Sequence, residues 1–418
     1  MTARRDTPGM AIKVLLATTV GWPSAGRLAG AFVTAGCTVD AILPSGHPAA
    51  ESRYFAHRHF YRALAGSPSF REALKAAQYD LIVPLDDRAV CLLLDLHANA
   101  TPGIASSIER SLGGIGAYGN LMSRAGFIDS ARAADICAPQ TRAVASQQDL
   151  EDALGDIGFP AVLKADLTWG GDGVVIAHDR EQALAAFHHL SDPPPRLRSL
   201  VRAIKRSDAH YLLAALHAKP GVISIQQFVP GVLVTTSMAC WQGRVLAANH
   251  LEVVVAQGAT GPASVVRRID NSQMDTAAAN LAARFALSGL HGLDYVRDAR
   301  GQVHLIEINP RAPQSSHLNF GAGHDLAAAL ARAAGAQAFP PRSMMATDTV
   351  ALFPQEWMRD PASPYLKSAY HDVPWDDPAL IRAWLTSIQS HPARREWDRF
   401  QAGSDERIQA GPAGATAP

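Results

Sequence analysis

The sequence predicts an α/β and α+β protein that begins with a domain built on a doubly wound parallel sheet. Two observations carry this prediction. Strand and helix signals alternate through the first hundred residues, which is typical of a parallel sheet with helices on both faces. Beyond residue 140 the strands are separated by Gly-containing turns, as in hairpins, and helices lie between some of them.

Apolar runs bounded by turn residues define the N-terminal elements. We expect strands at 13–18, 38–43 and 80–84, and helices at 25–35 and 70–78. Ser24 can cap the first helix and Gly36 ends it. The loop after the first strand, TTVGWPSAG, lies where such sheets bind ligands, but it lacks the GxGxxG pattern of a dinucleotide site. Asp86 and Asp87 follow the strand at 80–84.

The middle of the chain mixes both kinds of element. We expect helices at 121–134, 148–157, 180–190, 274–287 and 325–334. Strands are expected at 161–165, 174–177, 222–228, 232–241 and 244–255. The organisation predicted is an N-terminal domain over 1–110, a second domain over 111–335, and a C-terminal extension over 336–418 that ends in a disordered tail.

The composition of the chain argues against several classes of protein. The formal net charge is zero, which argues against a general nucleic-acid or anionic-membrane binder. The apolar run at 12–20 is too short to cross a bilayer, and no signal peptide is recognised. The four cysteines show no CxxC spacing, so they suit a reducing compartment and not a zinc site. We expect a cytoplasmic protein.

The segment 292–311, GLDYVRDARGQVHLIEINPR, reads as a β-hairpin. Because side chains alternate faces along a strand, Leu305, Glu307 and Asn309 are expected on one side, and Asp294 on the partner strand can join them. Two carboxylates and an amide oxygen form a hard-oxygen site that suits magnesium beside phosphate oxygens. A solvated hairpin whose acids face water is the alternative.

A second motif points to phosphate. Lys164 lies on an expected strand, and a Gly-rich loop with Gly170, Gly171 and Gly173 follows it. Glycines let backbone N–H groups approach phosphate oxygens closely, and an ammonium neutralises charge on the transferred group. A tight hairpin with an exposed lysine would look the same. The order of motifs favours phosphate: the lysine and its loop, then SIQQFVPG, then the acidic hairpin.

With these residues the chain resembles the ATP-grasp superfamily of ligases. The resemblance implies a two-lobed fold that binds the nucleotide between its lobes, the glycine-loop lobe covering about 140–230. It implies ATP with magnesium, as two ions, or manganese in their place, on Asp294, Glu307 and Asn309. Arg311 would steady the transferred group. The resemblance assigns to the nucleotide site Arg124, Lys164, Gly170, Gly171, Gly173, Val174, Gln226, Gln227, Phe228 and Val229.

Three positions depart from the family pattern. Arg124 stands where a second phosphate lysine is usual, although an arginine keeps the charge and can bridge phosphate oxygens. Gln226 replaces the hinge glutamate, and GVLVTTS offers no acidic residue for ribose. The implied activity is an ATP-dependent carboxylate–amine ligase that forms an acyl-phosphate and releases ADP and phosphate. A bicarbonate-using carboxylase or carbamoyl-phosphate-type enzyme, and a nucleotide-binding protein without catalysis, remain as alternatives.

The substrates are expected to be a small-molecule carboxylate and an amine. Ser315, Ser316 and His317 directly follow the acidic hairpin and are candidates for the acceptor pocket. Arg267 is a candidate for a substrate carboxylate. A loop histidine and an exposed, solvated arginine are the alternatives for His317 and Arg267. A homodimer is an expectation from the family alone.

Overall fold

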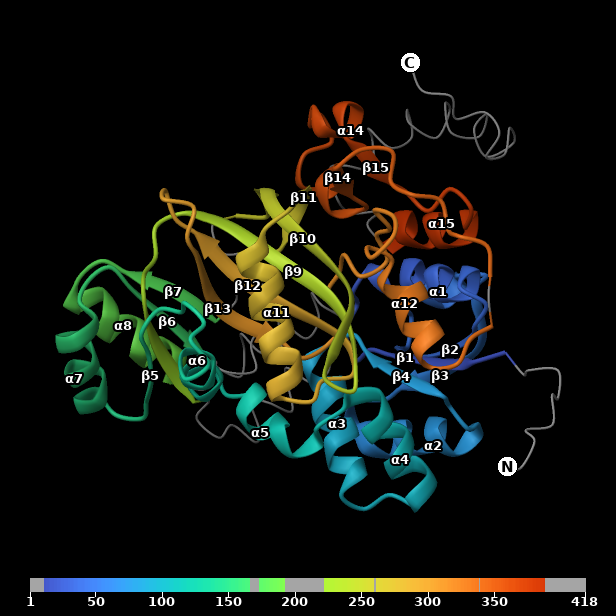
Figure 1. Cartoon of the computed structure of the whole chain (residues 1–418), viewed down its shortest axis with the longest axis horizontal. Helices are drawn as coiled ribbons and strands as arrows, with labels where there is room; N and C mark the ends of the chain where they lie inside the picture. Colours follow the sequence, from blue (N-terminus) through green and yellow to red (C-terminus); the bar gives the residue numbers. More distant parts are fainter. Residues whose placement is uncertain (1–10, 166–172, 192–221, 259–260, 338, 388–418) are drawn as a thin grey trace.

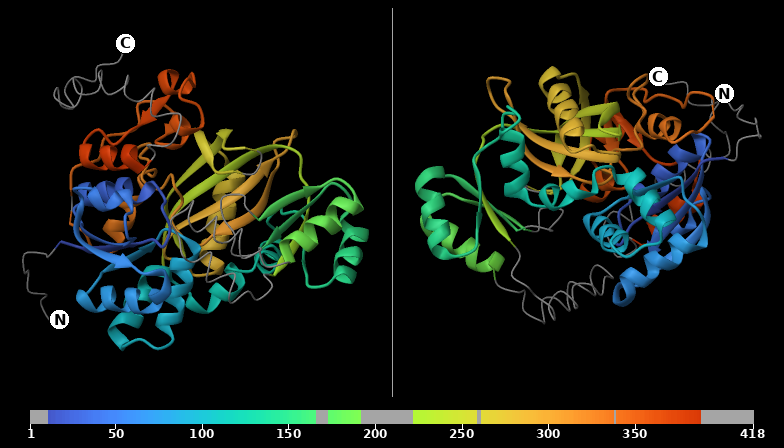
Figure 2. Two further views of the ribbon diagram at one scale, coloured as in Figure 1. Left: turned by 180° about the vertical axis from the view of Figure 1, so that it is seen from behind. Right: turned by 60° about the horizontal axis from the view of Figure 1, so that its bottom comes forward.

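The computed structural model of the chain describes residues 11–165, 173–191, 222–258, 261–337 and 339–387. Its strands form three sheets, with the orders β3-β2-β1-β4, β5-β8-β6-β7 and β13-β12-β9-β10-β11-β14-β15. The N-terminal domain and the small lobe around β5–β8 lie at opposite ends of the molecule, and the seven-stranded sheet lies between them (Figure 1). The further views in Figure 2 show the same arrangement.

The N-terminal sheet is parallel throughout, as the sequence predicts. Its strands are β1 (Lys13–Ala17), β2 (Thr38–Pro44), β3 (Phe55–Tyr61) and β4 (Leu81–Pro84). Side chains alternate along β1, so Val14 and Leu16 pack with helix α1 (Ser24–Thr34) while Leu15 packs with the helices on the other face. Those helices are α2 (Gly66–Ala76), α3 (Asp87–His97) and α4 (Pro102–Leu112). The sheet is therefore doubly wound.

Several N-terminal details differ from the prediction. Strand β3 and helices α3 and α4 are additional elements. Ser24 is a buried first residue of α1 and not its cap; Pro23 holds that position without a side-chain hydrogen bond. The capping acid lies further along, where Asp86 accepts a hydrogen bond from the Ala89 amide and begins α3.

The small lobe is an antiparallel sheet with helices on one face. Its strands are β5 (Thr141–Val144), β6 (Ala161–Ala165), β7 (Val174–Ala177) and β8 (Ile223–Gln227), of which the sequence did not predict β5. Helices α7 (Gln147–Ile157) and α8 (Arg180–Ser191) cover it with their own apolar core. A capping box between Ser146 and Asp149 begins α7.

The large sheet contains the predicted acidic hairpin. Its strands are β9 (Val232–Trp241), β10 (Arg244–Ala256), β11 (Ala263–Ile269), β12 (Gly289–Arg297), β13 (Val303–Asn309), β14 (Thr349–Leu352) and β15 (Tyr370–Asp372). Helices α5 (Tyr118–Leu121), α6 (Arg124–Arg132) and α11 (Ser272–Arg284) pack on one side and α12 (Leu326–Ala333) on the other. The sequence did not predict β11, β14 or β15. Because β14 and β15 belong to this sheet, the sheet extends past residue 335.

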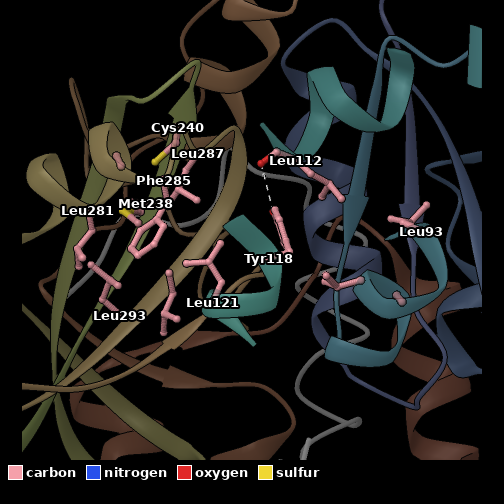
Figure 3. Packing of buried hydrophobic residues seen from close by; sticks show 14 of the residues in the cluster. Leu93, Leu112, Tyr118, Leu121, Met238, Cys240, Leu281, Phe285, Leu287 and Leu293 are labelled. Atoms are coloured by element: carbon pink, nitrogen blue, oxygen red, sulfur yellow. Dashed lines mark hydrogen bonds between the residues drawn. The ribbon is translucent and has the colours of Figure 1, made fainter. Parts of the chain in front are cut away.

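One apolar cluster joins the N-terminal domain to the large sheet (Figure 3). It runs from Leu93 of α3 through Leu112 and Tyr118 to Phe285 and Leu293. The buried Tyr118 hydroxyl donates to the Leu112 carbonyl oxygen at 3.1 Å, which ties the connection after α4 to α5. The N-terminal domain therefore packs on the large sheet through a shared apolar core.

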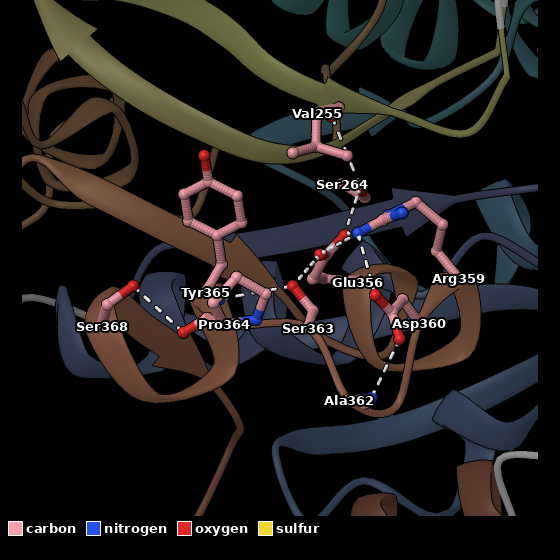
Figure 4. Close-up of polar contacts among 10 residues, drawn as sticks. All are labelled: Val255, Ser264, Glu356, Arg359, Asp360, Ala362, Ser363, Pro364, Tyr365 and Ser368. Atoms are coloured by element: carbon pink, nitrogen blue, oxygen red, sulfur yellow. Dashed lines mark hydrogen bonds and ion pairs between the residues drawn. The ribbon is translucent and has the colours of Figure 1, made fainter.

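The C-terminal segment is fixed to the large sheet by a buried carboxylate (Figure 4). Its remaining helices are α13 (Gln355–Arg359), α14 (Tyr365–Ser368) and α15 (Pro378–Ser387). Glu356 on α13 is fully buried and accepts hydrogen bonds from Ser264 at 2.7 Å, from Ser363 and from Arg359. Ser264 is on β11, so this carboxylate attaches α13 to the sheet. The predicted disordered tail lies outside the described residues.

We expect Glu356→Ala to lower the free energy of unfolding by about 3 kcal/mol, because it leaves Arg359 and two hydroxyls without their buried acceptor. Burial would raise the pKa of Glu356, but its hydrogen bonds, led by the one from Arg359, hold that pKa below the usual range. The stabilisation is therefore present at neutral pH and is lost as the pH falls through the lowered pKa. Urea denaturation across pH measures it.

Glu72→Ala is the matched control, because the Glu72 pair with Arg62 is exposed. An equal loss of stability in both variants would contradict the role of Glu356. Among the described residues, no helix combines the length and apolar character needed to cross a membrane.

Candidate active site

A cavity of about 580 Å³ lies where the small lobe, the large sheet and the N-terminal domain meet. The small lobe contributes side chains from β6, β7 and β8, and the large sheet contributes the ends of β12 and β13. The loops after β1 and β4 close the remaining side with Trp22, Ser24 and Asp87. These loops leave the carboxyl ends of parallel strands, which is where such sheets bind ligands.

The acidic hairpin forms as predicted, and its register brings the two carboxylates together. Asp294 on β12 lies directly opposite Glu307 on β13. A β-bulge follows, because Tyr295 pairs with Leu305 and leaves Ile306 as the extra residue. The expectation that Leu305 shares a face with Glu307 is therefore wrong. Leu305 is buried in the core, while Ile306, Glu307 and Asn309 line the cavity.

The three predicted metal ligands lie together: Asn309 contacts Asp294, and Glu307 faces Asp294 across the strand pair. The Asn309 amide donates to Asp294 Oδ2 at 2.8 Å, and Asn309 Oδ1 accepts from Arg311 at 3.0 Å. Burial raises the pKa of Asp294 to about 6, and the Glu307 carboxylate adds to that rise. Two facing carboxylates in a buried cavity are a donor set that a divalent cation would satisfy.

Within the described residues, three or more His, Cys, Asp or Glu side chains do not gather into a metal cluster. A cation here would therefore complete its shell with oxygens from outside the chain, such as phosphate oxygens or water.

Two basic side chains converge on Glu307 from different elements. Lys164 on β6 places Nζ 3.9 Å from Glu307 Oε2, and Arg124 at the start of α6 places Nε 3.5 Å from the same oxygen. Burial would raise the pKa of Glu307, but Lys164 and Arg124 outweigh it and hold that pKa below its usual range. Burial also lowers the pKa of Lys164. These desolvated cations face the volume where anionic groups would bind.

The predicted hinge also lines the cavity. Gln226, Gln227, Phe228 and Val229 all contribute to its wall. The Gln226 amide donates to Thr141 Oγ1 at 2.9 Å within the small lobe and to the Ile306 carbonyl oxygen at 3.3 Å on β13. It therefore bonds to both lobes at the bulge. Gly231 follows the hinge. A glycine is needed at this position, because a Cβ there would overlap the Arg297 carbonyl oxygen.

An apolar slot adjoins the hinge. Its walls include Val162 and Ile176 of the small lobe and Ile306 of the large sheet. Val174 also lines the cavity, and the Ala165 amide donates to the Gly173 carbonyl oxygen at 2.9 Å. Gly170 and Gly171 lie outside the described residues. A flat apolar ring with polar edges would fit between these walls and the hinge backbone.

The four candidate substrate residues do not gather at the cavity. Ser315 lines it, and its hydroxyl lies 2.7 Å from the Ser237 hydroxyl. Ser316 is buried and donates to the Pro313 carbonyl oxygen. His317 is buried with Nε2 2.7 Å from Asp372 Oδ2, in a cluster that includes Arg27. Arg267 pairs with Glu252 and is half exposed.

The N-terminal contribution to the cavity was not among the predicted site residues. Asp87 Oδ1 lies 3.4 Å from Arg311 Nε. The available signal was the pair of acids that directly follows an apolar parallel strand. The contact itself joins segments far apart in the chain, so only the folded structure reveals it.

The comparisons with known proteins bear on this geometry. A family model described as an ATP-grasp domain matches residues 139–315. The chain contains an ATP-grasp domain. The match begins just before β5 and ends at Ser315, so it spans the small lobe, the hinge and the acidic hairpin around the cavity.

Several solved structures share the fold of this chain over most of its length. The biotin carboxylase domain of Hydrogenobacter thermophilus 2-oxoglutarate carboxylase, in complex with MgADP and bicarbonate, has a TM-score of 0.56 at 14% identity over 80% of this chain and 72% of that one. Campylobacter jejuni biotin carboxylase has a TM-score of 0.57 at 13% identity over 79% and 72%. Staphylococcus aureus N5-carboxyaminoimidazole synthetase with ADP has 0.56 at 13% identity over 79% of each.

A curated relative is the large chain of carbamoyl phosphate synthase from Methanothermobacter thermautotrophicus, at 23% identity over 188 residues. The match covers 43% of this chain and 16% of that protein. The chain thus spans a small part of that relative's length.

Proposed function

We propose that the protein is an ATP-dependent ligase that activates a small-molecule carboxylate as an acyl-phosphate and couples it to an amine, with release of ADP and phosphate. One observation carries the proposal. Asp294, Glu307 and Asn309 face a single cavity together with Lys164, Arg124 and Arg311, beside an apolar slot at the hinge. Carboxylates that could hold a cation and basic side chains that could bind phosphate thus lie beside an apolar slot that could hold a purine.

The roles of the residues follow from their positions. The hinge from Gln226 to Val229 and the slot would hold the adenine ring. Lys164 and Arg124 would bind phosphate oxygens, with Val174 and the glycine loop alongside. Catalysis would come mainly from positioning and charge neutralisation.

Arg311, which contacts Asn309 and Asp87, would steady the transferred phosphoryl group and the resulting acyl-phosphate. Asp294, Glu307 and Asn309 would hold magnesium, as two ions, or manganese, which would supply positive charge to offset that of the phosphates. Ser315 at the cavity wall is the candidate of the predicted set that would contact the acceptor.

The wider setting of the enzyme is part of the proposal. Four free cysteines support a cytoplasmic location. The crystallised biotin carboxylase domain of the H. thermophilus enzyme is named as a dimer, which supports a homodimer here. The proposed domains cover residues 1–110 and 111–335, and the C-terminal extension from 336 adds strands β14 and β15 to the large sheet.

The test is to incubate the purified protein with ATP, magnesium and pools of amino acids, and to measure ADP, AMP and phosphate. Pool-dependent release of ADP and phosphate, absent from Glu307→Ala, would support the ligase. AMP as the product would contradict an acyl-phosphate mechanism. Binding of ATP without turnover in any pool would favour a nucleotide-binding protein without catalysis.

A second candidate is a bicarbonate-using carboxylase or carbamoyl-phosphate-type enzyme. The curated relative is a carbamoyl phosphate synthase chain, and two of the similar structures are biotin carboxylases. Bicarbonate added without amino acids distinguishes the candidates. Bicarbonate-dependent ADP release would favour this second function, and pool-dependent release in bicarbonate-free buffer would favour the first.

The pH dependence of metal binding provides a separate prediction. Because the pKa of Asp294 is raised to about 6, this carboxyl is ionised at pH 7.5 and binds a proton below pH 6. We expect the affinity for Mg²⁺ in the presence of ADP to fall about tenfold per pH unit below that value, because the proton competes with the cation. Isothermal titration calorimetry at several pH values measures it.

Asp294→Asn is the control for this pH dependence. The variant should bind Mg²⁺ weakly at every pH, without the inflection near pH 6. An affinity in the wild type that stays constant from pH 7.5 to pH 5 would contradict a role for Asp294 as a ligand.

A further inference from the structure

The two acids that follow β4 have different environments. Asp86 is saturated with donors: it accepts from the Thr18 and Thr19 hydroxyls and from the backbone amides of Thr19 and Ala89. These bonds join the loop after β1 to the start of α3. Asp86 therefore has a structural role, because each of its oxygens already accepts two hydrogen bonds from the protein.

Asp87 has the opposite character. It lines the cavity, and its Oδ1 atom is buried without a hydrogen-bond partner among the described residues. Its ion contact to Arg311 spans 3.4 Å. Burial raises the pKa of Asp87, with smaller contributions from Asp86 and Glu307. A buried carboxylate in this state is stabilised by a ligand that brings positive charge and N–H donors.

Asp87 lies beside Arg311, the residue proposed to steady the acyl-phosphate that the amine attacks. A continuous series of contacts runs from Asp294 to Asn309, from Asn309 to Arg311, and from Arg311 to Asp87. The hinge and most of the apolar slot belong to the small lobe, whereas Asp87 enters from the N-terminal domain. Asp87 is thus adjacent to the arginine that would steady the acyl-phosphate, away from the adenine slot.

Other N-terminal groups complete this end of the cavity. Trp22 supplies an aromatic side chain of the kind that packs against ammonium groups, and Ser24 supplies a hydroxyl. Ser315 lies on the opposing loop. The lining that Asp87 shares thus includes an aromatic ring and hydroxyl oxygens, which are groups that an ammonium can contact.

We propose that Asp87 binds the nucleophile and selects for a cationic primary amine; this inference rests on the proposed ligase function. When Arg311 engages the transferred phosphoryl group, the ammonium takes its place beside Asp87. One N–H proton then passes to the Asp87 carboxylate, and the freed lone pair attacks the acyl carbon. The C–N bond forms as the C–O bond to phosphate breaks. Phosphate leaves with the electron pair and takes up the second nitrogen proton.

The experiment compares two nucleophiles in the full-length protein. Wild type, Asp87→Asn and the control Asp95→Asn are incubated with ATP, magnesium and the amino-acid pool, with or without excess hydroxylamine. Hydroxylamine is uncharged near neutral pH and traps acyl-phosphates as hydroxamates. Asp95 lies on the exposed side of the same helix, so its variant carries the same substitution outside the cavity.

Asp87→Asn should lower the rate of amide formation from the pool about 10²-fold, because it removes the charge that pairs with the ammonium. Its hydroxamate yield should fall far less, since an uncharged nucleophile does not need that charge. Asp95→Asn should match the wild type in both assays. Thermal unfolding of all three proteins checks that the fold is kept.

Equal loss of amide and hydroxamate in Asp87→Asn would overturn the inference, because Asp87 would then act on acyl-phosphate formation itself. Retention of full amide formation would overturn it as well. A wild-type protein that forms no hydroxamate from any pool would mean that the proposed ligase function fails, and the assignment of Asp87 fails with it. The failure of the inference and the failure of the function thus give different results.

Discussion

Glu307→Gln is expected to lower the rate of ADP release about 10³-fold under saturating ATP and magnesium, because one neutral amide replaces the carboxylate at the centre of the site. Glu307 faces Asp294 across the strand pair and receives both Lys164 and Arg124. The substitution keeps the shape of the side chain, so the loss reports its charge. A coupled assay for ADP measures the rate.

The control for this variant is Glu151→Gln, at a surface pair with Arg180 on the small lobe. It should turn over ATP like the wild type. The Glu307→Gln protein should fold but unfold at a lower temperature than the wild type, because Lys164 and Arg124 lose their counter-charge, so rates are compared well below that temperature. Turnover within a few-fold of wild type in Glu307→Gln would contradict the proposed metal site.

Lys164→Met is expected to reduce kcat/KM for ATP by about 10²–10³-fold, because it removes a desolvated cation from the phosphate-facing wall. The side chain is buried, so its charge acts at low screening. Methionine keeps most of the apolar stem volume. Initial rates over a range of ATP concentrations separate kcat from KM.

Arg124→Lys provides the comparison, because it restores the lysine usual in the family and keeps the positive charge. It should retain most of the activity, although a lysine makes fewer hydrogen bonds than the guanidinium. A Lys164→Met protein with the kcat/KM of the wild type would show that Lys164 serves only to balance Glu307 in the folded protein.

The candidate site was predictable to the extent that its chemistry lies within single strands. Apolar runs bounded by turn residues predict the strand of Lys164 and the hairpin of Asp294, Glu307 and Asn309, and the structure brings these side chains to one cavity. The bulge at Ile306 was not readable, because one extra residue in a strand leaves no signature in an apolar run. It is also what separates Leu305 from Glu307.

A local turn explains why two of the candidate substrate residues, Ser316 and His317, do not line the cavity. The Ser316 amide bonds to the Pro313 carbonyl oxygen and the Leu318 amide to that of Ser315, so the chain turns sharply after the acidic hairpin. The turn leaves Ser315 at the cavity wall and directs His317 toward Asp372. Asp372 is on β15, a three-residue strand too short for a periodic signal.

The parallel N-terminal sheet was predicted, but its role in the cavity was not. The alternation of strands and helices is a property of consecutive residues, whereas the Asp87–Arg311 contact depends on how the domain packs on the large sheet. Likewise, Glu356 holds β11 through hydrogen bonds that join distant segments. Such tertiary contacts have no counterpart in local sequence pattern.

The most direct test of the account follows oxygen from the carboxylate. The protein is incubated with ATP, magnesium and amino acids whose carboxylates carry heavy oxygen, and the released phosphate is analysed by mass spectrometry. The acyl-phosphate mechanism predicts one heavy oxygen atom in each phosphate, because the carboxylate oxygen that attacks ATP leaves with it. Unlabelled phosphate released during amide formation would contradict the mechanism.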